Sequence, residues 1–471
     1  MPRSNRLAMW AGRKWAATRW TAIACLAIAS TALADPTTAT ARPTAANPPV
    51  TKQPIYSDWF ADAAMRVDLF HTGTATESVY SIDDIAQEPT WPGTRTHLVD
   101  PFGYGAYRFR VLDTESSVEI FSMGYGSLFM EWTGTQEAVD QTRRSMSESV
   151  RFPWPKNPVT LEIDKRQPNG IFVKVYAINI NPRSHLINKV RKHANLETVT
   201  LHPSSHDHSN TLDIVILPEG YSSTDDSKLR ADLSRFTESF LSTPPWNSIS
   251  DRVAVRAVLA YSRDSGITEP RKGVFLDTVF GATFNTFDSP RYLTITHTKT
   301  MREIAALVPY DAVFIMANSA RYGGGGVFNQ WAVFSSDNEY DDYVMLHEFG
   351  HSMAGLGDEY YDSAVSTDED TMYPPGVEPW EPNISAFLSN QRDSIKWNHA
   401  ISSNTPIPTP ITDEHQSSIG LFEGAGYKAK GLYRPQADCK MFHKGTVPFC
   451  SICSLAIERM TSYYTGESIN Q

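Results

Sequence analysis

The pattern of apolar and polar positions divides the chain into two regions with different predicted elements. From Ile55 to Pro182, apolar residues form short runs that are typical of strands. Asn169-Gly170 separates two of these runs and tolerates positive φ, which indicates a β-hairpin. We therefore expect residues 55–185 to form a β-sandwich-like N-terminal domain with a structural or substrate-positioning role. The strand-like runs are 106–111, 118–121, 161–163 and 171–180.

The second region alternates between strand-like and helix-like patterns. This alternation predicts an α/β domain with a mixed, partly parallel sheet over residues 205–471. A polar connection, 189–210, comes before its first strand. A proline-rich stretch, 362–416, contains one short helical candidate at 384–397 and is expected to form the far wall of a cleft. Strands are predicted at 212–217, 253–259 and 312–316, and helices within 229–240 and 298–308.

Four consecutive glycines, Gly323 to Gly326, precede a further apolar run, Trp331 to Ser335. A phosphate-binding loop would need a lysine and a following helix, and neither is present. We interpret Trp331–Ser335 as an edge strand that borders the cleft and pairs with an extended substrate. The glycines would let the backbone of that edge come close to a substrate and flex. A plain mobile hairpin loop explains them equally well.

The next helical segment contains the pattern His-Glu-x-x-His at residues 347–351. Because helical residues four apart lie on the same face, His347 and His351 project together and can bind one zinc ion. Glu348 follows the first ligand directly, where it can accept a proton from a metal-activated water. The apolar residues 343–346 indicate that this helix enters a buried interior.

A third protein ligand is expected shortly after this helix. Gly355 and Gly357 favour its termination, because glycine tolerates the left-handed backbone that ends helices. Asp358 comes directly after the turn and is the first choice as third ligand. Glu359 is the alternative, and either acid could instead orient an imidazole.

The first 34 residues predict a secretory signal peptide. They contain five basic residues and no acid, followed by a short apolar run that ends in Ala32-Leu33-Ala34, with cleavage expected after Ala34. A flexible linker rich in Thr, Ala and Pro follows at 35–54. Without the signal peptide, Lys plus Arg falls from 42 to 37 against 53 acids, a net charge of about −16. This acidic balance disfavours nucleic acid and anionic membranes as partners and suits a secreted or periplasmic protein.

Cys25 would leave with the signal peptide, and three cysteines remain near the C-terminus. In an oxidising compartment, two of Cys439, Cys450 and Cys453 are expected to form a disulfide, leaving one free. The sequence does not determine which two. The alternative is a second zinc site that uses Cys450, Cys453 and His443, and it requires reduced thiols.

Several motifs together resemble the IgA-peptidase family of secreted bacterial zinc endopeptidases. Those motifs are residues 347–361, 420–427, 433–435, 439–441 and 449–453. Members carry an N-terminal β domain ahead of the catalytic domain, so the resemblance covers nearly the whole mature chain.

The resemblance implies a zincin-like catalytic domain with His347, His351 and Asp358 as zinc ligands. It also implies Glu348 as general base and Met441 in a turn beneath the metal. The chain departs from the broader metzincin pattern, in which the glycine and the third ligand lie three and six residues after the second histidine. Here Ala354 and Gly357 occupy those two positions. The glycine, Gly355, and the expected ligand, Asp358, each come one residue later, so the loop is one residue longer.

We therefore expect a zinc endopeptidase that acts on proteins or peptides as a monomer, without nucleic acid or stable membrane association. Tyr433 is expected to donate to the oxyanion, and Tyr360 and Tyr427 compete for that role. An inactive or non-peptidase zinc domain, with an N-terminal domain that binds protein or carbohydrate, is the alternative. Hydrolysis of a non-peptide amide is another. Intact His347, Glu348 and His351 disfavour the inactive scaffold.

Overall fold

The structure, a computed structural model, describes residues 52–361 and 369–469. The predicted signal peptide, 1–34, and most of the predicted linker, 35–54, lie outside these ranges. Within the described ranges, no helix is long and apolar enough to cross a bilayer.

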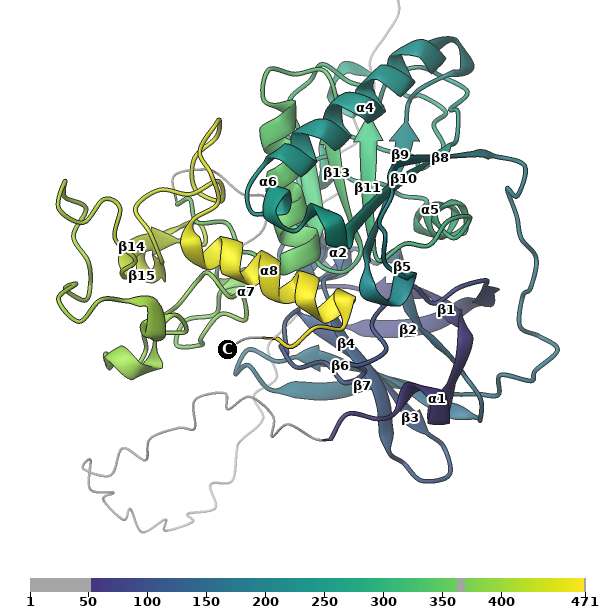
Figure 1. The fold of residues 1–471 in the computed structure, drawn as a ribbon, viewed down its shortest axis with the longest axis horizontal. Coiled ribbons are helices and arrows are strands. Elements are labelled where there is room, and N and C mark those ends of the chain that lie inside the picture. Colours follow the sequence, from purple (N-terminus) through teal and green to yellow (C-terminus); the bar gives the residue numbers. More distant parts are fainter. Residues whose placement is uncertain (1–51, 362–368, 470–471) are drawn as a thin grey trace, which may run out of the picture. The chain divides into compact units, whose positions relative to one another are not determined.

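The N-terminal region consists of two antiparallel sheets that share one hydrophobic core, so the predicted β-rich domain is confirmed (Figure 1). Strand β3 alternates strictly between buried and partly exposed residues, as expected when one face covers a core. The predicted hairpin is formed by β6 and β7, and Gly170 has a φ of 81° in its turn. The first sheet has the order β2-β1-β5 and the second β4-β3-β6-β7.

The elements of this region are the strands β1 (Phe60–Gly73), β2 (Ser78–Glu88), β3 (Tyr107–Asp113), β4 (Glu119–Tyr125), β5 (Arg144–Pro155), β6 (Val159–Arg166) and β7 (Phe172–Ile180), with the short helices α1 (Tyr56–Trp59), α2 (Leu128–Thr133) and α3 (Gln136–Val139).

The second region is built on a six-stranded mixed sheet in the order β12-β13-β11-β9-β10-β8. The four central strands are parallel, and the two outer strands are antiparallel to their neighbours. The predicted partly parallel sheet is therefore confirmed. Its strands are β8 (Glu197–His202), β9 (Leu212–Glu219), β10 (Val253–Leu259), β11 (Ala312–Ala317), β12 (Gly324–Val327) and β13 (Trp331–Ser335).

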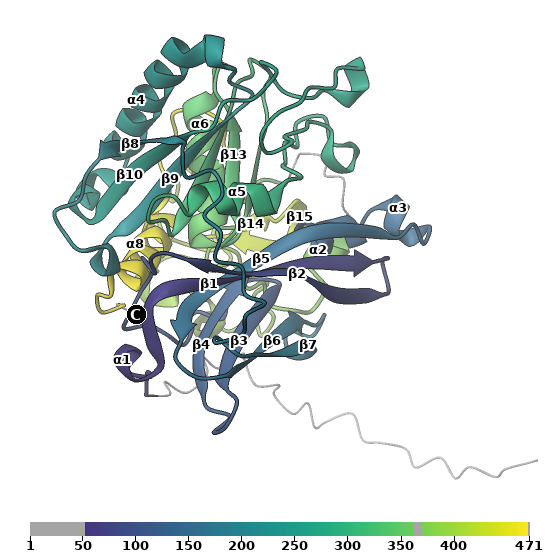
Figure 2. The ribbon, with the colours of Figure 1, turned by 90° about the vertical axis from the view of Figure 1, so that its right-hand side faces the viewer.

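Helices cover both faces of this sheet (Figure 1). Helices α4 (Asp226–Ser242), α6 (Asp341–Ala354) and α8 (Ser451–Thr465) contribute to the core on one face, and α5 (Thr298–Ala305) packs on the other. Strand β5 of the N-terminal region runs beside α5 (Figure 2). The remaining elements are α7 (Glu369–Met372) and the hairpin of β14 (Phe422–Ala425) and β15 (Lys428–Arg434).

Three sequence predictions about this region were wrong. Trp331–Ser335 is not an edge strand, because β13 lies between β11 and β12 and all five of its residues are buried. The edge is instead the glycine-rich strand β12. The polar connection contains the outer strand β8, which the apolar pattern did not indicate because none of its residues is buried.

No α-helix forms at 384–397, where the structure has a 3₁₀ turn at Arg392–Ser394. Phe387 and Asn390 have φ values of 48° and 52°, which an α-helix does not allow. Lys396 Nζ also donates to the carbonyls of Pro379, Glu381 and Ile384, at 2.5 to 2.7 Å. These contacts hold the backbone in an irregular path.

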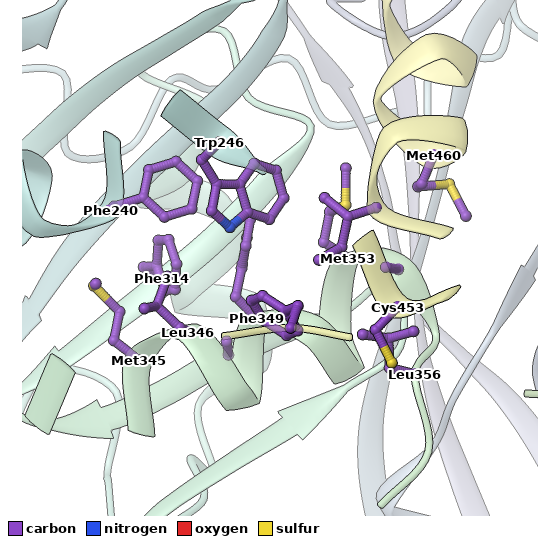
Figure 3. Packing of buried hydrophobic residues seen from close by; sticks show 14 of the residues in the cluster. Phe240, Trp246, Phe314, Met345, Leu346, Phe349, Met353, Leu356, Cys453 and Met460 are labelled. Atoms are coloured by element: carbon purple, nitrogen blue, oxygen red, sulfur yellow. The ribbon is translucent and has the colours of Figure 1, made fainter. Parts of the chain in front are cut away.

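Helix α6 is fixed in the core by Phe349, which lies among aromatic rings from other elements (Figure 3). Phe349 stacks on Phe314 of β11 at a centroid distance of 4.3 Å. Trp246 and Phe240 approach the same ring at 5.3 and 5.4 Å. Because these rings are almost fully buried, they hold α6 firmly against the sheet.

Candidate active site

Helix α6 carries the His-Glu-x-x-His pattern and ends where the sequence predicts. Asp341 and Asp342 lie in its first turn, where negative charge is favourable. Gly355 has a φ of 64°, and its amide bonds back to the carbonyl of His351 at 3.1 Å. The chain then turns back beneath the helix, which brings residue 358 to the two histidines.

Three donor atoms converge at this turn. His347 Nε2 and His351 Nε2 are 3.1 Å apart, and Asp358 Oδ1 lies 3.0 Å from the first and 3.3 Å from the second. Two imidazoles and one carboxylate are the kind of ligand set that a catalytic zinc site uses, with a fourth position left open. The structure thus brings together the three residues that the sequence predicted as ligands.

The surroundings of these residues fit metal binding. His351 Nδ1 lies 2.6 Å from the carbonyl oxygen of Leu356, and His347 Nδ1 lies 3.2 Å from that of Lys440. Each Nδ1–H can donate to its carbonyl, which leaves the Nε2 lone pair of a neutral ring directed at the shared point. Such contacts orient metal-binding imidazoles.

Asp358 is held as a carboxylate. Burial by itself would raise the pKa of this carboxyl group. The imidazoles of His351 and His347 have the larger, opposite effect, so the pKa lies well below its ordinary value. The hydroxyl of Tyr427 donates a short hydrogen bond to Asp358 Oδ2. Asp358 Oδ1 is buried and accepts no hydrogen bond from any described residue, as expected of an atom that binds a metal.

Glu359 does not face the two histidines. Its Oε1 accepts a hydrogen bond from Asn383 Nδ2 at 3.0 Å and lies 3.2 Å from Cys453 Sγ. The alternative third ligand is therefore part of a separate buried cluster.

Glu348 lies at the contact between α6 and β12. Burial raises its pKa above the ordinary value, while His347 and His351 oppose the shift. A Cβ atom on Gly324 would lie 2.6 Å from Glu348 Oε1, and one on Gly326 would lie 2.3 Å from the Glu348 carbonyl oxygen. The glycines therefore allow close approach of strand and helix, rather than forming a loop.

A cavity of about 270 Å³ opens over His347, His351 and Asp358. Its walls come from three separate parts of the chain, including the N-terminal region and the segment after residue 369. The residues expected to form a far wall contribute Met372, Tyr373, Trp380 and Glu381. Besides His347, His351, Asp358 and Tyr373, the side chains that carry charge or a hydroxyl group in its lining are Ser127, Glu131, Ser289, Arg291, Tyr292, Tyr322, Tyr343, Glu348, Tyr360, Glu381 and Tyr427.

Glu131 and Arg291 were not singled out from the sequence, because neither residue lies in a motif or close to α6 along the chain. Tyr292 bonds to Glu131 Oε2 at 2.5 Å and joins the N-terminal region to this cavity. Arg291 Nη2 donates to the Tyr360 hydroxyl at 3.0 Å.

Tyr433, the expected oxyanion donor, is not among the residues that line the cavity. It lies on β15, and its ring packs against Phe387 at 5.9 Å. Met441, in contrast, lies under α6 as the family resemblance implies. Its Sδ is 3.1 Å from the position that a Cβ on Gly350 would occupy.

The three C-terminal cysteines are all buried free thiols, so the expected disulfide is absent. Instead of one bonded pair and one free thiol, all three sulfur atoms gather around the Glu359 carboxylate. His443 is not part of this cluster, because its Nδ1 pairs with Asp438 at 2.6 Å on the surface.

Comparison with known families accounts for most of the chain. The model of the family described as IgA Peptidase M64 matches residues 199–418 and 411–461. The model described as Peptidase M64 N-terminus matches residues 55–177. No curated protein matches the chain significantly. Since the first model alone covers more than half of the sequence and includes α6, the chain belongs to the IgA peptidase M64 family of peptidases.

Proposed function

We propose that this protein is a zinc-dependent endopeptidase with a zincin-like catalytic domain. The observation that carries the proposal is the convergence of His347 Nε2, His351 Nε2 and Asp358 Oδ1 within 3.0 to 3.3 Å beneath a cavity. Nitrogen and carboxylate donors in this number favour zinc in a hydrolytic site. When bound, zinc polarises the scissile carbonyl and acidifies the attacking water.

Glu348 is the proposed general base. It follows a ligand residue on α6 and lines the cavity. Burial raises the pKa of its carboxyl group, which makes the carboxylate a better proton acceptor and its acid a usable donor. Glu348 would take the proton from the water and pass it to the leaving amine.

Arg291 is the proposed donor for the developing oxyanion. The guanidinium group carries five N–H donors, and one of them bonds to Tyr360 at 3.0 Å. Its position in the cavity wall makes it better suited than Tyr433, which packs elsewhere. A fixed positive charge in a site shielded from water stabilises a developing negative charge strongly.

The substrate would be an extended peptide that pairs with β12 at Gly326, because Gly324 already exchanges main-chain hydrogen bonds with Arg291 and Leu293. The backbone of Gly324 to Gly326 lines the cavity next to Glu348. A peptide on a strand edge is held by main-chain hydrogen bonds, which do not depend on its side chains. Ser127 and Glu131 of the N-terminal region would contact the opposite side of such a peptide.

We also propose that the protein is exported, with the first 34 residues removed after Ala34. The basic segment, the apolar run and the Ala-x-Ala ending support this. N-terminal sequencing of protein recovered from outside the cytoplasm should begin at Asp35. An N-terminus that still contains the basic segment would contradict it.

The test of the activity compares the wild type with Glu348→Ala. Both proteins should contain zinc at the His347, His351 and Asp358 site, and only the wild type should cleave an unfolded protein such as casein. A His347→Ala, His351→Ala double variant should lose both that zinc and the cleavage.

Zinc at this site without cleavage of any unfolded protein would contradict endopeptidase activity. Wild-type protein with the same zinc content as the double histidine variant would contradict the proposed ligands. Full cleavage by Glu348→Ala would remove Glu348 from the mechanism.

A further inference from the structure

We propose that Cys439, Cys450, Cys453 and Glu359 bind a second zinc ion, which has a structural role and is separate from the catalytic site. All four residues are buried, and one ligand atom from each lies within 4.8 Å of the others. Three thiolates and one carboxylate complete a four-coordinate set, which is the closed arrangement of structural zinc sites.

The distances within this cluster, here called the Cys₃Glu cluster, suit one tetrahedral ion. Zinc–sulfur bonds of about 2.3 Å and zinc–oxygen bonds of about 2.0 Å place ligand sulfur and oxygen atoms about 3.5 Å apart. Glu359 Oε1 lies 3.2 Å from Cys453 Sγ and 4.0 Å from Cys450 Sγ. Glu359 Oε2 is buried and accepts no hydrogen bond within the described residues.

Backbone amides surround the sulfur atoms, as is expected for thiolates. The amides of Cys450 and Met441 point to Cys439 Sγ at 3.2 and 3.4 Å. Cys450 caps the N-terminus of α8, and its Sγ accepts from the Cys453 amide at 3.4 Å. These partial positive charges would stabilise the thiolates that a bound metal ion requires.

Two further groups fix the carboxylate of the cluster. Asn383 Nδ2 donates to Glu359 Oε1 at 3.0 Å, and this asparagine also bonds to the backbone of Gly357 through both of its polar atoms. Arg434 interacts electrostatically with Glu359 and Cys439. The site would carry an excess of negative charge when zinc is bound, and Arg434 offsets part of it.

A metal explains the arrangement better than a disulfide does. One disulfide would use two sulfur atoms and leave a thiol and a carboxylate buried side by side, which is unfavourable without a shared cation or proton. Zinc would use all four groups and release the thiol protons to solvent. The buried thiolates would then be protected from oxidation by their bonds to the metal.

The cluster also connects to the catalytic residues. Glu359 follows Asp358 directly, and its amide donates to the Met441 carbonyl at 2.9 Å. Cys439 is followed by Lys440, whose carbonyl faces His347 Nδ1 at 3.2 Å. A metal at the Cys₃Glu cluster would therefore hold both segments that position His347 and Asp358.

Cobalt substitution and zinc analysis test this inference without measuring peptidase activity. In the His347→Ala, His351→Ala double variant, about one zinc per chain should remain, against about two in the wild type. When this variant is loaded with cobalt(II), it should show a thiolate-to-cobalt charge-transfer band in the near ultraviolet. A site with only nitrogen and oxygen ligands does not give that band. The band therefore reports on the Cys₃Glu cluster alone, whether or not the catalytic proposal is correct.

Adding Cys450→Ser and Cys453→Ser to the double histidine variant should abolish both the remaining zinc and the band. The matched control is His443→Ala, which should keep both because His443 pairs with Asp438 outside the cluster. Unfolded, metal-free wild-type protein should react with three equivalents of thiol reagent, one for each cysteine after the predicted signal peptide.

A cobalt-loaded double histidine variant without the charge-transfer band would overturn the inference. So would one reactive thiol together with a disulfide in protein purified without reductant. If the cysteine variant fails to fold, the band and zinc content of the folded double histidine variant still decide the question.

Discussion

The neighbouring acids Asp358 and Glu359 have the same chemical group and different surroundings. Asp358 faces two imidazoles and the Tyr427 hydroxyl, and Glu359 faces an amide and cysteine sulfur. Local sequence cannot separate two adjacent acids, because the partners that distinguish them come from residues far along the chain. The order of the two residues after the turn favours Asp358 as the third ligand, and Asp358 is the acid that lies 3.0 and 3.3 Å from the two imidazoles.

The hydrogen bond from Tyr427 predicts a specific effect on the metal. Tyr427→Phe removes the donor to Asp358 Oδ2 and leaves the ring in its packing against Tyr360. Loss of such a contact lowers metal affinity by about 10- to 100-fold. Competition with a zinc chelator at graded concentrations measures the change, with Tyr373→Phe as a control on a second tyrosine of the same wall. An affinity equal to that of the wild type would contradict the role of Tyr427.

Arg291 and Tyr433 give opposite predictions for the oxyanion. Arg291→Met should lower kcat by about 10²- to 10³-fold with a smaller change in KM, because the interaction forms fully only in the transition state. Tyr433→Phe should leave both constants near those of the wild type, since its ring packs against Phe387 outside the cavity. A large fall in kcat for Tyr433→Phe would restore the interpretation reached from sequence.

At the scale of elements, the contact of β12 with α6 depends on glycine. Gly326→Ala would place a methyl group 2.3 Å from the Glu348 carbonyl oxygen, so strand and helix must separate. We expect a loss of about 1–3 kcal/mol in the free energy of unfolding, together with a larger than proportional loss of kcat/KM.

Denaturant unfolding and steady-state kinetics on Gly326→Ala test this. The control is Gly431→Ala, where φ is 82° and an added Cβ meets no atom within 4 Å. It should lose stability through backbone strain and keep kcat/KM. Equal catalytic effects of the two variants would mean that the close approach at Gly326 is not needed for catalysis.

Elements with a strong apolar pattern could be predicted from sequence, and those without one could not. The buried runs of β9, β10 and β11 and the periodic residues of α4 fall where their patterns indicate. Strand β8 has no buried residue, and β12 is mostly glycine, so neither carries a signal. Because a run of glycines resembles a loop in sequence, β12 was not recognised as a strand, and Trp331–Ser335 was wrongly predicted to be the edge of the sheet.

At the scale of the whole molecule, a buried ion-pair network in the N-terminal sheet β2-β1-β5 contacts the second region through Arg151. Glu88 is paired with Arg66 at 3.0 Å and with Arg151 at 2.8 Å. Arg151 in turn donates to the Tyr310 carbonyl at 3.1 Å and lies over the Tyr310 ring. Sequence could not predict this contact, since its members are separated by tens to hundreds of residues and form no motif.

Glu88→Ala should therefore destabilise the whole protein. It leaves two buried guanidinium groups without their shared partner, which costs about 3–5 kcal/mol. The control is Glu77→Ala, which breaks an exposed pair with Arg143 and should change stability by less than about 1 kcal/mol. Denaturant midpoints measure both, and similar midpoints for the two variants would contradict the argument.

The walls of the cavity come from three parts of the chain, and they also restrict what can reach His347, His351 and Asp358. About 270 Å³ accommodates a few residues of extended chain and excludes a folded domain. Cleavage would then depend on the substrate's own local unfolding, and linkers between domains would be cut before the domains themselves. One disulfide-bonded substrate can be tested in its oxidised and its reduced state. The ratio of the two cleavage rates should equal the ratio of the locally unfolded populations of the substrate in those two states.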